Sequence, residues 1–325
     1  MGDNIFVGID IGGTTAKIGL VNDKGKILEK EVVHTLSSRD WREIIDEFLK
    51  PVDKWFGKNV KFKGIGIGAP GFINKKSGIL FNCENIPGLI NAPFVDYIKD
   101  RYKLPVMADN DATCAAIGEH IFGAGKDFTD FLMVTVGTGI GGGLILNDKV
   151  YRGMDGYAGE LGHIIVVAEG RECTCGNKGC IEPYASATSI VKRIRDGIKK
   201  GYIKSYNDVD SKSIDAKLVF EKAIAGDLHS IDAIESAARY LGRLLGGIVN
   251  LLNLQAIIIG GGIAASGDYY IEKIKFYCSQ VAWYSFTKDL KIVPAKLLND
   301  AGIIGAASLI LEEEKEKNIL KRSVL

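Results

Sequence analysis

The chain has 325 residues, of which 46% are hydrophobic and 25% are charged, and its formal net charge is +1. This length suffices for two lobes with separate cores, and the balanced charge argues against disorder, a nucleic-acid partner or a membrane-surface partner. The N-terminus lacks a signal-peptide pattern and no apolar run reaches the length of a membrane helix, so we expect a cytoplasmic location.

The chain begins with alternating predicted strands and helices. The segments "IFVGID", "AKIGLV" and "KILEKEVV" favour strands, joined by the glycine turn "IGGTT" and the hairpin signal "NDKG". A helix is predicted from about Asp40 to Phe56, followed by a buried strand in "KFKGIGIGAPG". The segment "NAPFVDYIKDRY" predicts a helix with proline near its start. The strand "LPVMADND" then leads into a helix in "ATCAAIGEHIF".

The opening pattern recurs near the middle of the chain. The segment "FLMVTVGTGIGGGLILNDKV" aligns with the first two strands without a gap at a constant offset of 125 residues, so that Gly12 matches Gly137. The tripeptide "NDK" at residue 22 recurs at residue 147, and the apolar positions keep the same register. The repeat predicts two structurally similar lobes, each opening with a hairpin whose turn is rich in glycine.

Helical spacing dominates the rest of the chain. Helices are predicted in "SATSIVKRIRDGIKK", in "DAKLVFEKAIAGD" with Gly226 as a stop, and in "HSIDAIESAARYLGRLLGGIVNLLN". The segments "QAIIIGGG" and "LKIVPAKL" predict strands. A final helix is predicted in "DAGIIGAASLILEEEKEK", with Asp300 as its cap. No linker is rich in proline or serine, so we expect the lobes to pack around a hinge.

Three glycine-rich turns follow buried strands, at residues 10–15, 137–143 and 260–262. Glycines let backbone N–H groups approach phosphate oxygens and adopt positive φ, so three such turns in one chain favour a nucleotide site over ordinary hairpins. None matches the P-loop pattern, and the dinucleotide pattern in "GTGIGG" is followed by a strand where a helix is needed. Asp10, at the end of the first strand, could bind hydrated Mg²⁺ or merely cap the turn.

Polar residues suited to a sugar substrate lie between these turns. The stretch "ADND" places Asn110 and Asp111 between a strand and a helix. A carboxylate there could accept the proton of a hydroxyl group, or it could merely cap the helix. Asn85 in "FNCENIPG", together with Glu160 and His163 in "GYAGELGH", could hydrogen-bond to sugar hydroxyls.

Three of the six cysteines, Cys173, Cys175 and Cys180, cluster in "CTCGNKGC". A disulfide would leave one of the three without a partner, whereas a metal would use all three and need a fourth ligand, which His163 could supply. Clustered cysteines in a reducing compartment are more often metal ligands or catalytic groups than disulfides.

In their order along the chain, these motifs resemble those of the ROK family of sugar kinases, within the actin/hexokinase superfamily. The resemblance runs from "GIDIGGT" through "GAPG", "NIPG", "DNDA", "GTGIGGG", "GELGH", "CTCGNKGCIE" and "IIIGGG" to "DAGIIGAA". It implies an α/β fold with two actin/hexokinase-like (ribonuclease H-like) lobes around a cleft, and an inserted zinc knuckle. Residues 1–118 with 300–325 would form the small lobe, and residues 119–299 the large lobe.

The resemblance also implies roles for individual residues, with Asp111 as the catalytic base. The expected sugar contacts are Asn85, Asn110, Asp111, Glu160, His163 and Glu182. The expected site for the nucleotide and Mg²⁺ comprises Asp10, Gly12, Gly13, Thr14, Lys17, Gly137, Thr138, Gly139, Gly260, Gly261 and Gly262. The expected ligands of a structural Zn²⁺ are His163, Cys173, Cys175 and Cys180, with the second ring nitrogen of His163 aimed at a sugar hydroxyl.

The implied activity is ATP-dependent phosphorylation of the 6-hydroxyl of glucose, as in glycolysis, by a homodimer or homotetramer whose partners are small molecules. Leu89 and Thr113 replace the common Trp and Asn of the family, which leaves N-acetylmannosamine, N-acetylglucosamine, mannose and fructose as alternative sugars. The sequence does not fix the phosphoryl donor, so ADP and polyphosphate are alternatives to ATP. A non-catalytic sugar-sensing regulator is a further alternative. Family repressors carry a DNA-binding helix-turn-helix ahead of the first phosphate strand, which here begins at Ile5, so we expect the enzyme.

Overall fold

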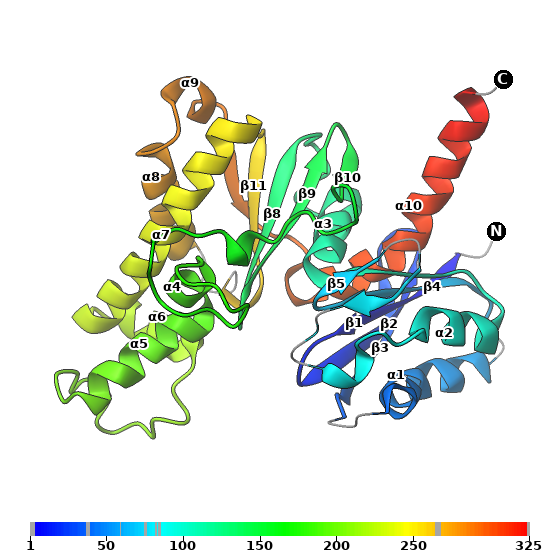
Figure 1. The fold of residues 1–325 in the computed structure, drawn as a ribbon, viewed down its shortest axis with the longest axis horizontal. Helices are drawn as coiled ribbons and strands as arrows, with labels where there is room; N and C mark the ends of the chain where they lie inside the picture. The colour runs from blue at the N-terminus through cyan, green and yellow to red at the C-terminus, as the bar shows by residue number, and fades with distance from the viewer. Residues whose placement is uncertain are drawn as a thin grey trace. The chain divides into compact units, whose positions relative to one another are not determined.

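The computed structural model describes residues 4–36, 40–58, 60–74, 77–81, 83, 86–263 and 268–323. Two five-stranded sheets form its framework (Figure 1). Contacts divide the chain into two compact units, and the division runs through strand β9 (Ile140–Leu146). The first unit comprises Met1–Thr129, Gly143–Gly159 and Asn299–Leu325, and the second comprises Asp130–Gly142 and Glu160–Leu298. These contacts group residues 119–129 and 143–159 with the first unit, whereas the lobes proposed from the sequence begin the second at residue 119.

The first sheet has the strand order β3-β2-β1-β4-β7. Strands β1, β2 and β3 form an antiparallel meander, and β4 and β7 run parallel to β1. Their bounds are β1 Ile5–Ile11, β2 Thr15–Asn22, β3 Ile27–His34, β4 Phe62–Ala69 and β7 Val106–Asn110. Because β1, β4 and β7 are parallel, their carboxyl ends lie at one edge of the sheet, which is where ligands bind in open α/β sheets.

The second sheet has the order β10-β9-β8-β11-β12, which matches the first strand for strand. Strands β10 and β9 are antiparallel, and β8, β11 and β12 run parallel. Their bounds are β8 Phe131–Val136, β9 Ile140–Leu146, β10 Lys149–Tyr151, β11 Ala256–Gly260 and β12 Lys291–Pro294. The internal repeat predicted from the sequence is therefore confirmed as a repeat of sheet topology.

Four helices cover the sheet of the first unit: α1 (Trp41–Phe56), α2 (Phe94–Tyr102), α3 (Asp111–Phe122) and α10 (Ala301–Ser323). Asp40 caps α1 by accepting a hydrogen bond from the N–H of Arg42. The buried face of α1 includes Ile44, Phe48 and Trp55, spaced for one side of a helix. A short hairpin, β5 (Phe72–Ile73) with β6 (Leu80–Phe81), and the turn η1 (Pro87–Leu89) complete the described part of this unit.

Helix α10 brings the C-terminal segment onto the N-terminal sheet, beside α3 (Figure 1). Glycines allow this close packing. A Cβ atom at Gly66 of β4 would lie 1.7 Å from the carbonyl oxygen of Ala306, and one at Gly305 would lie 1.7 Å from the carbonyl oxygen of Cys114. A side chain at either position would push the helix away, so these glycines fix α10 against both β4 and α3. Asp300, the expected cap of α10, ends the turn η4 (Leu298–Asp300) and pairs with Lys30.

The described helices of the second unit lie mostly between β10 and β12 in the sequence. They are α4 (Glu182–Ala185), α5 (Ala187–Lys199), α6 (Ala216–Ile224), α7 (Leu228–Leu252), α8 (Asp268–Ser279) and α9 (Tyr284–Thr287), with the turn η2 (Leu161–His163). Gly226 ends α6 with a φ of 95°, which confirms it as a helix stop. Among the described residues, no helix combines the length and apolarity needed to cross a bilayer.

Candidate active site and metal centre

Acidic residues gather at the carboxyl ends of the parallel strands in the first sheet. Asp10 of β1, Gly68 of β4 and Asp109 of β7 share one row of the register. Asn110 ends β7, and Asp111 begins α3. The pKa of the buried Cys114 thiol is raised well above its usual value by burial and then by the carboxylates of Asp109, Asp10 and Asp111. The three carboxylates therefore share one neighbourhood.

The structure separates the two roles that "ADND" could have. Asn110 is the N-cap of α3, because its Oδ1 accepts hydrogen bonds from the N–H groups of Ala112 (2.9 Å) and Thr113 (3.2 Å). Its Nδ2 donates to the carbonyl of Gly71. Asp111 is the first residue of the helix, and its Oδ1 accepts from the N–H of Ala112 at 2.8 Å. Asn110 therefore has the capping role. The carboxylate of Asp111, at the start of the helix, is the group suited to accept the proton of a hydroxyl.

Asp10 lies at the end of β1, against the start of α10. A Cβ atom at Gly302 would approach Oδ2 of Asp10 to 2.5 Å, so glycine is needed there. Burial raises the pKa of Asp10, while Lys17, whose Nζ lies 3.6 Å from Oδ2, lowers it. Lys17 also donates to the carbonyl of Asn299. A carboxylate of this kind fits Mg²⁺, which is usually held through one or two carboxylates together with substrate phosphates.

The first glycine turn joins β1 to β2. The N–H of Gly12 donates to the carbonyl of Thr15 at 2.9 Å, and the hydroxyl of Thr35 donates to the carbonyl of Gly12 at 2.8 Å. Gly13 and Thr14 are exposed at the tip of the turn. Five residues of the expected nucleotide site, Asp10, Gly12, Gly13, Thr14 and Lys17, are thus on this hairpin.

The other two glycine turns lie together in the second unit. Gly261 has a φ of 82°, and a Cβ there would lie 2.5 Å from the carbonyl oxygen of Val136, the residue before Gly137. A Cβ at Gly137 or Gly262 would meet no atom within 4 Å, so the backbone is open at both positions. Positive φ was expected of these glycines in general. Among the predicted nucleotide-site residues only Gly261 adopts it. At Gly12, Gly139 and Gly260 a Cβ atom would lie within 3 Å of a neighbouring atom, so close packing explains glycine there.

The turn at 137–139 is anchored to the helices of the second unit. The N–H of Ala187, the first residue of α5, donates to the carbonyl of Gly137 at 2.9 Å. A pocket of about 520 Å³ lies beside Thr138, between α5 and the start of α6; its lining residues are Thr138, Ala187, Thr188, Val191, Lys192, Arg195, Asp196, Asp215 and Ala216. This pocket could not be predicted from the sequence, because Thr188, Val191 and Arg195 have a spacing found on one face of any helix.

The predicted sugar contacts of the second unit form one cluster. Oε2 of Glu182 accepts a hydrogen bond from the N–H of Ile140 at 3.0 Å, and a Cβ at Gly139 would lie 2.3 Å from this oxygen. Oε2 of Glu160 lies 3.9 Å from Nε2 of His163. Burial raises the pKa of Glu160 above its usual value. His163 opposes this shift and Glu182 adds to it. Asn110 and Asp111 belong to the first unit, and Asn85 lies outside the described residues.

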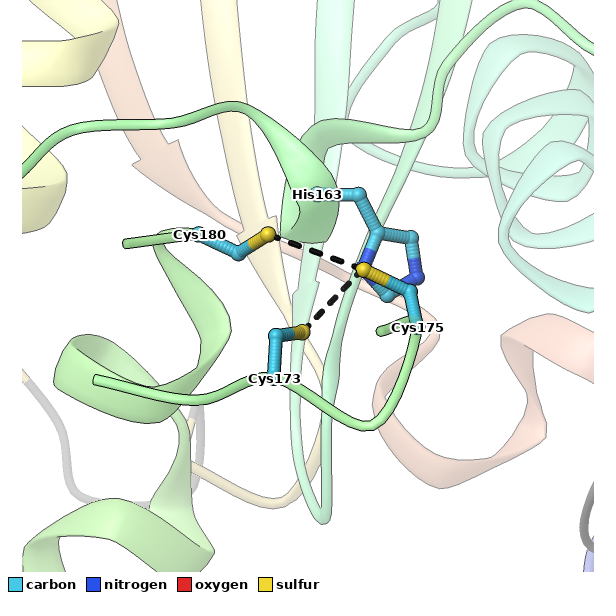
Figure 2. Close-up of side chains that lie close together, drawn as sticks. All are labelled: His163, Cys173, Cys175 and Cys180. Carbon is cyan, nitrogen blue, oxygen red and sulfur yellow. Dashed lines mark hydrogen bonds between the residues drawn. The ribbon is translucent and has the colours of Figure 1, made fainter. Parts of the chain in front are cut away.

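The second unit also contains a Cys₃His cluster, formed by Cys173, Cys175, Cys180 and His163 (Figure 2). All four ligand atoms lie within 4.8 Å of one another. Sγ of Cys173 lies 3.6 Å from Nδ1 of His163, and Sγ of Cys175 lies 3.7 Å from Sγ of Cys180. Zinc–sulfur bonds of about 2.3 Å in a tetrahedron place sulfur atoms roughly 3.8 Å apart, so the cluster fits a closed zinc site. None of the six cysteines forms a disulfide.

Backbone hydrogen bonds shape the knuckle, residues 173–180, around these ligands. The N–H of Cys173 donates to the carbonyl of Asn177, and Ile165 forms an antiparallel bridge with Cys180. Gly179 has a φ of 83° and lies so close to Val167 that a Cβ would be 1.7 Å from its carbonyl oxygen. Burial and the neighbouring thiols raise the pKa of Cys180 to about 12. Burial and the neighbouring thiols thus disfavour the ionised thiolate, and a bound divalent cation would stabilise it.

A family model described as ROK family matches residues 6–313. The chain belongs to the ROK family. The family and the α/β fold class predicted from the sequence are thereby confirmed.

ROK relatives of this chain include both enzymes and regulators. The glucokinase of Halalkalibacterium halodurans is 36% identical over 321 residues, which cover 97% of each chain. A xylose repressor of Caldicellulosiruptor bescii is 30% identical over 316 residues, which cover 95% of this chain and 78% of the repressor. The crystal structure of a ROK glucokinase from Streptomyces griseus in complex with glucose and AMPPNP has a TM-score of 0.84 and 32% identity, covering 94% of this chain and 99% of the other.

Proposed function

We propose that this protein transfers the γ-phosphoryl group of ATP to the 6-hydroxyl of glucose. The observation that carries this proposal is the placement of Asp10 and Asp111 at one edge of the first sheet. Phosphoryl transfer to an alcohol needs a base for the hydroxyl proton and a carboxylate for the metal that accompanies the phosphates. A protein that only senses a sugar needs neither group.

Asp111 is the proposed general base. Its position at the start of α3 is fixed by the Asn110 cap and by its own hydrogen bond with the N–H of Ala112. It accepts the proton of the 6-hydroxyl as that oxygen attacks the γ-phosphorus, while the bond from phosphorus to the bridging oxygen of ADP breaks. General-base catalysis of this kind typically contributes ~10²- to 10⁴-fold in rate.

The nucleotide is proposed to use the glycine turns and the pocket beside Thr138. The open space beside Gly137 and Gly262 suits phosphate oxygens, because no side chain at either position blocks their approach to the backbone of these turns. The N–H of Gly137 itself donates to the carbonyl of Gly139 at 3.0 Å, so it holds the shape of the turn. The pocket between α5 and α6 suits the nucleoside, and similarity to a glucokinase solved with AMPPNP supports an adenine nucleotide. Asp10 would hold Mg²⁺, which supplies positive charge to the phosphates when it is bound.

Glu160, His163 and Glu182 are the proposed sugar contacts of the second unit. Nδ1 of His163 faces the thiols, so Nε2 remains for a sugar hydroxyl, and the Cys₃His cluster would hold a structural Zn²⁺ with no position left for substrate. The role of the metal would be to fix the direction of the imidazole and the position of the knuckle, which ends two residues before Glu182.

A coupled assay with ATP and Mg²⁺ across a panel of hexoses tests this function. We expect the highest kcat/KM with glucose, and glucose 6-phosphate as the product by NMR. Turnover with N-acetylmannosamine or another hexose above glucose would change the proposed substrate and keep the proposed chemistry. Sugar binding by calorimetry without turnover on any hexose or donor would favour the regulator and contradict the proposal.

A further inference from the structure

Arg152 forms a buried ion triad with Asp109 and Glu312 in the first unit. Its Nε donates to Oδ2 of Asp109 at 2.7 Å, and one terminal nitrogen donates to Oε2 of Glu312 at 2.8 Å. The guanidinium side chain is only 10% exposed. Burial disfavours its charged form, but the carboxylates of Asp109 and Glu312 outweigh this effect and raise the pKa of Arg152.

The triad is one hydrogen bond away from the segment that carries the proposed base. While Oδ2 of Asp109 accepts from Arg152, Oδ1 of Asp109 accepts from the N–H of Asn110 at 2.9 Å. Asn110 in turn caps α3, whose first residue is Asp111. The orientation of the Asp109 carboxylate therefore affects the backbone at the point where β7 becomes α3.

Glu312 connects the same arginine to α10. This helix touches Asp10 through Gly302 near its start and the backbone of Cys114, in α3, through Gly305. Arg152 thus links the end of β7 to the helix that also borders the proposed magnesium ligand.

Stability alone does not require charged residues at these positions. Buried ion triads lose much of their Coulombic attraction to desolvation, and apolar residues of similar volume are often equally stabilising or more so. We propose that Arg152 is a positioning residue for the reaction. It holds Asp109, and through it Asn110 and Asp111, in the geometry that proton transfer needs. This inference rests on the proposed kinase function.

Two variants separate positioning from stability. Arg152→Lys keeps the charge but lacks the planar fork that can bridge two carboxylates. The triple variant Asp109→Leu, Arg152→Met, Glu312→Met removes all three charges of the triad, so that none is left buried without a partner. Arg101→Lys is the matched control, because Arg101 also bridges two carboxylates, Asp46 and Asp53, but does so near the protein surface between α1 and α2.

For each variant we would measure kcat, KM for glucose and ATP, and Tm. A displacement of about 1 Å in a catalytic group can cost roughly 10²-fold in rate. We therefore expect kcat to fall about 10- to 100-fold in both Arg152 variants, with either KM changed less than about threefold. The triple variant should keep a Tm near that of the wild type, and Arg101→Lys should keep its kcat.

A triple variant with wild-type kcat would overturn the positioning role. An Arg152→Lys variant whose loss of kcat is accompanied by a matching loss of Tm would also overturn it, because loss of stability would then explain the loss of activity. A wild type that phosphorylates no sugar would overturn the kinase function, and the role of Arg152 with it. Because wild-type turnover is measured in the same series, the two failures are distinguishable.

Discussion

Gly302 lies directly against the carboxylate of Asp10, and a methyl group at this position would come within 2.5 Å of both Cγ and Oδ2. The first turn of α10 therefore borders the proposed magnesium ligand. Gly302→Ala should displace Asp10 without changing its chemistry. We expect kcat/KM for Mg·ATP to fall at least tenfold, with glucose affinity changed much less.

Gly247→Ala is the matched control for this substitution, because Gly247 lies within α7 and a Cβ there meets no atom within 4 Å. It should retain full activity and gain roughly 0.5–1 kcal/mol in stability, as alanine usually does over glycine in a helix. A Gly302→Ala variant with unchanged nucleotide kinetics would separate α10 from the function of Asp10.

Asp10→Asn should raise the apparent KM for Mg·ATP and lower kcat, because it removes the charge that faces the metal. The same variant should be more stable than the wild type at pH 7. Burial raises the pKa of Asp10 in the folded state, so its ionised form costs free energy that asparagine avoids. This difference in stability should vanish below the usual pKa of 3.8, where Asp10 is protonated in both the folded and the unfolded wild type. Thermal unfolding between pH 3.5 and 8 would measure it, and a difference that widens toward low pH would contradict the assignment.

Cys175→Ser should lose the metal and most of the sugar affinity. The purified wild type should contain about one zinc per chain, because the cluster supplies four ligands. Loss of one ligand relaxes the knuckle and releases His163 and Glu182 from their positions. Elemental analysis and glucose titration would test this, with Cys278→Ala, a buried cysteine outside the cluster, as the control. A metal-free wild type with full activity would show that the cysteines are incidental.

Glu182→Gln should weaken glucose binding while leaving the zinc content and the KM for ATP unchanged. The amide can still accept the hydrogen bond from the N–H of Ile140, so the local fold should persist. Loss of a hydrogen bond to a charged group costs about 1.5–3 kcal/mol, or roughly 10- to 100-fold in affinity. Glu172→Gln, an exposed acid beside the knuckle, is the control. Equal glucose affinity in both variants would remove Glu182 from the sugar site.

The parts of the site that a local pattern encodes could be predicted from the sequence. The spacing of Cys173, Cys175 and Cys180 brings their thiols together within one short loop, and His163 joins them through the bridge between Ile165 and Cys180. The repeat of "NDK" 125 residues apart predicted two similar sheets, because strand register and turn chemistry are local properties.

Features that depend on tertiary contacts could not be predicted. Arg152 is 43 residues from Asp109 and 160 residues from Glu312, and no periodicity marks any of the three. The pocket beside Thr138 depends on how α5 and α6 pack, which their own sequences do not specify. The sequence does not decide whether Asn110 or Asp111 caps α3. Both are good capping residues, and only the backbone conformation selects Asn110.

Asp111 is proposed as the base in phosphoryl transfer, and the variant Asp111→Asn tests this role. Asparagine can still accept the hydrogen bond from the N–H of Ala112, so α3 should form normally. Its amide cannot take up a proton. Turnover with glucose and Mg·ATP and glucose binding by calorimetry would be measured side by side, with the exposed Asp100→Asn as the control.

We predict that Asp111→Asn lowers kcat by ~10²- to 10⁴-fold, the usual range for a general base, and binds glucose within about threefold of the wild type. Asp100→Asn should match the wild type in both measurements. An Asp111→Asn variant that retains more than about a tenth of wild-type kcat would exclude Asp111 as the base, because that loss is too small for the removal of a base.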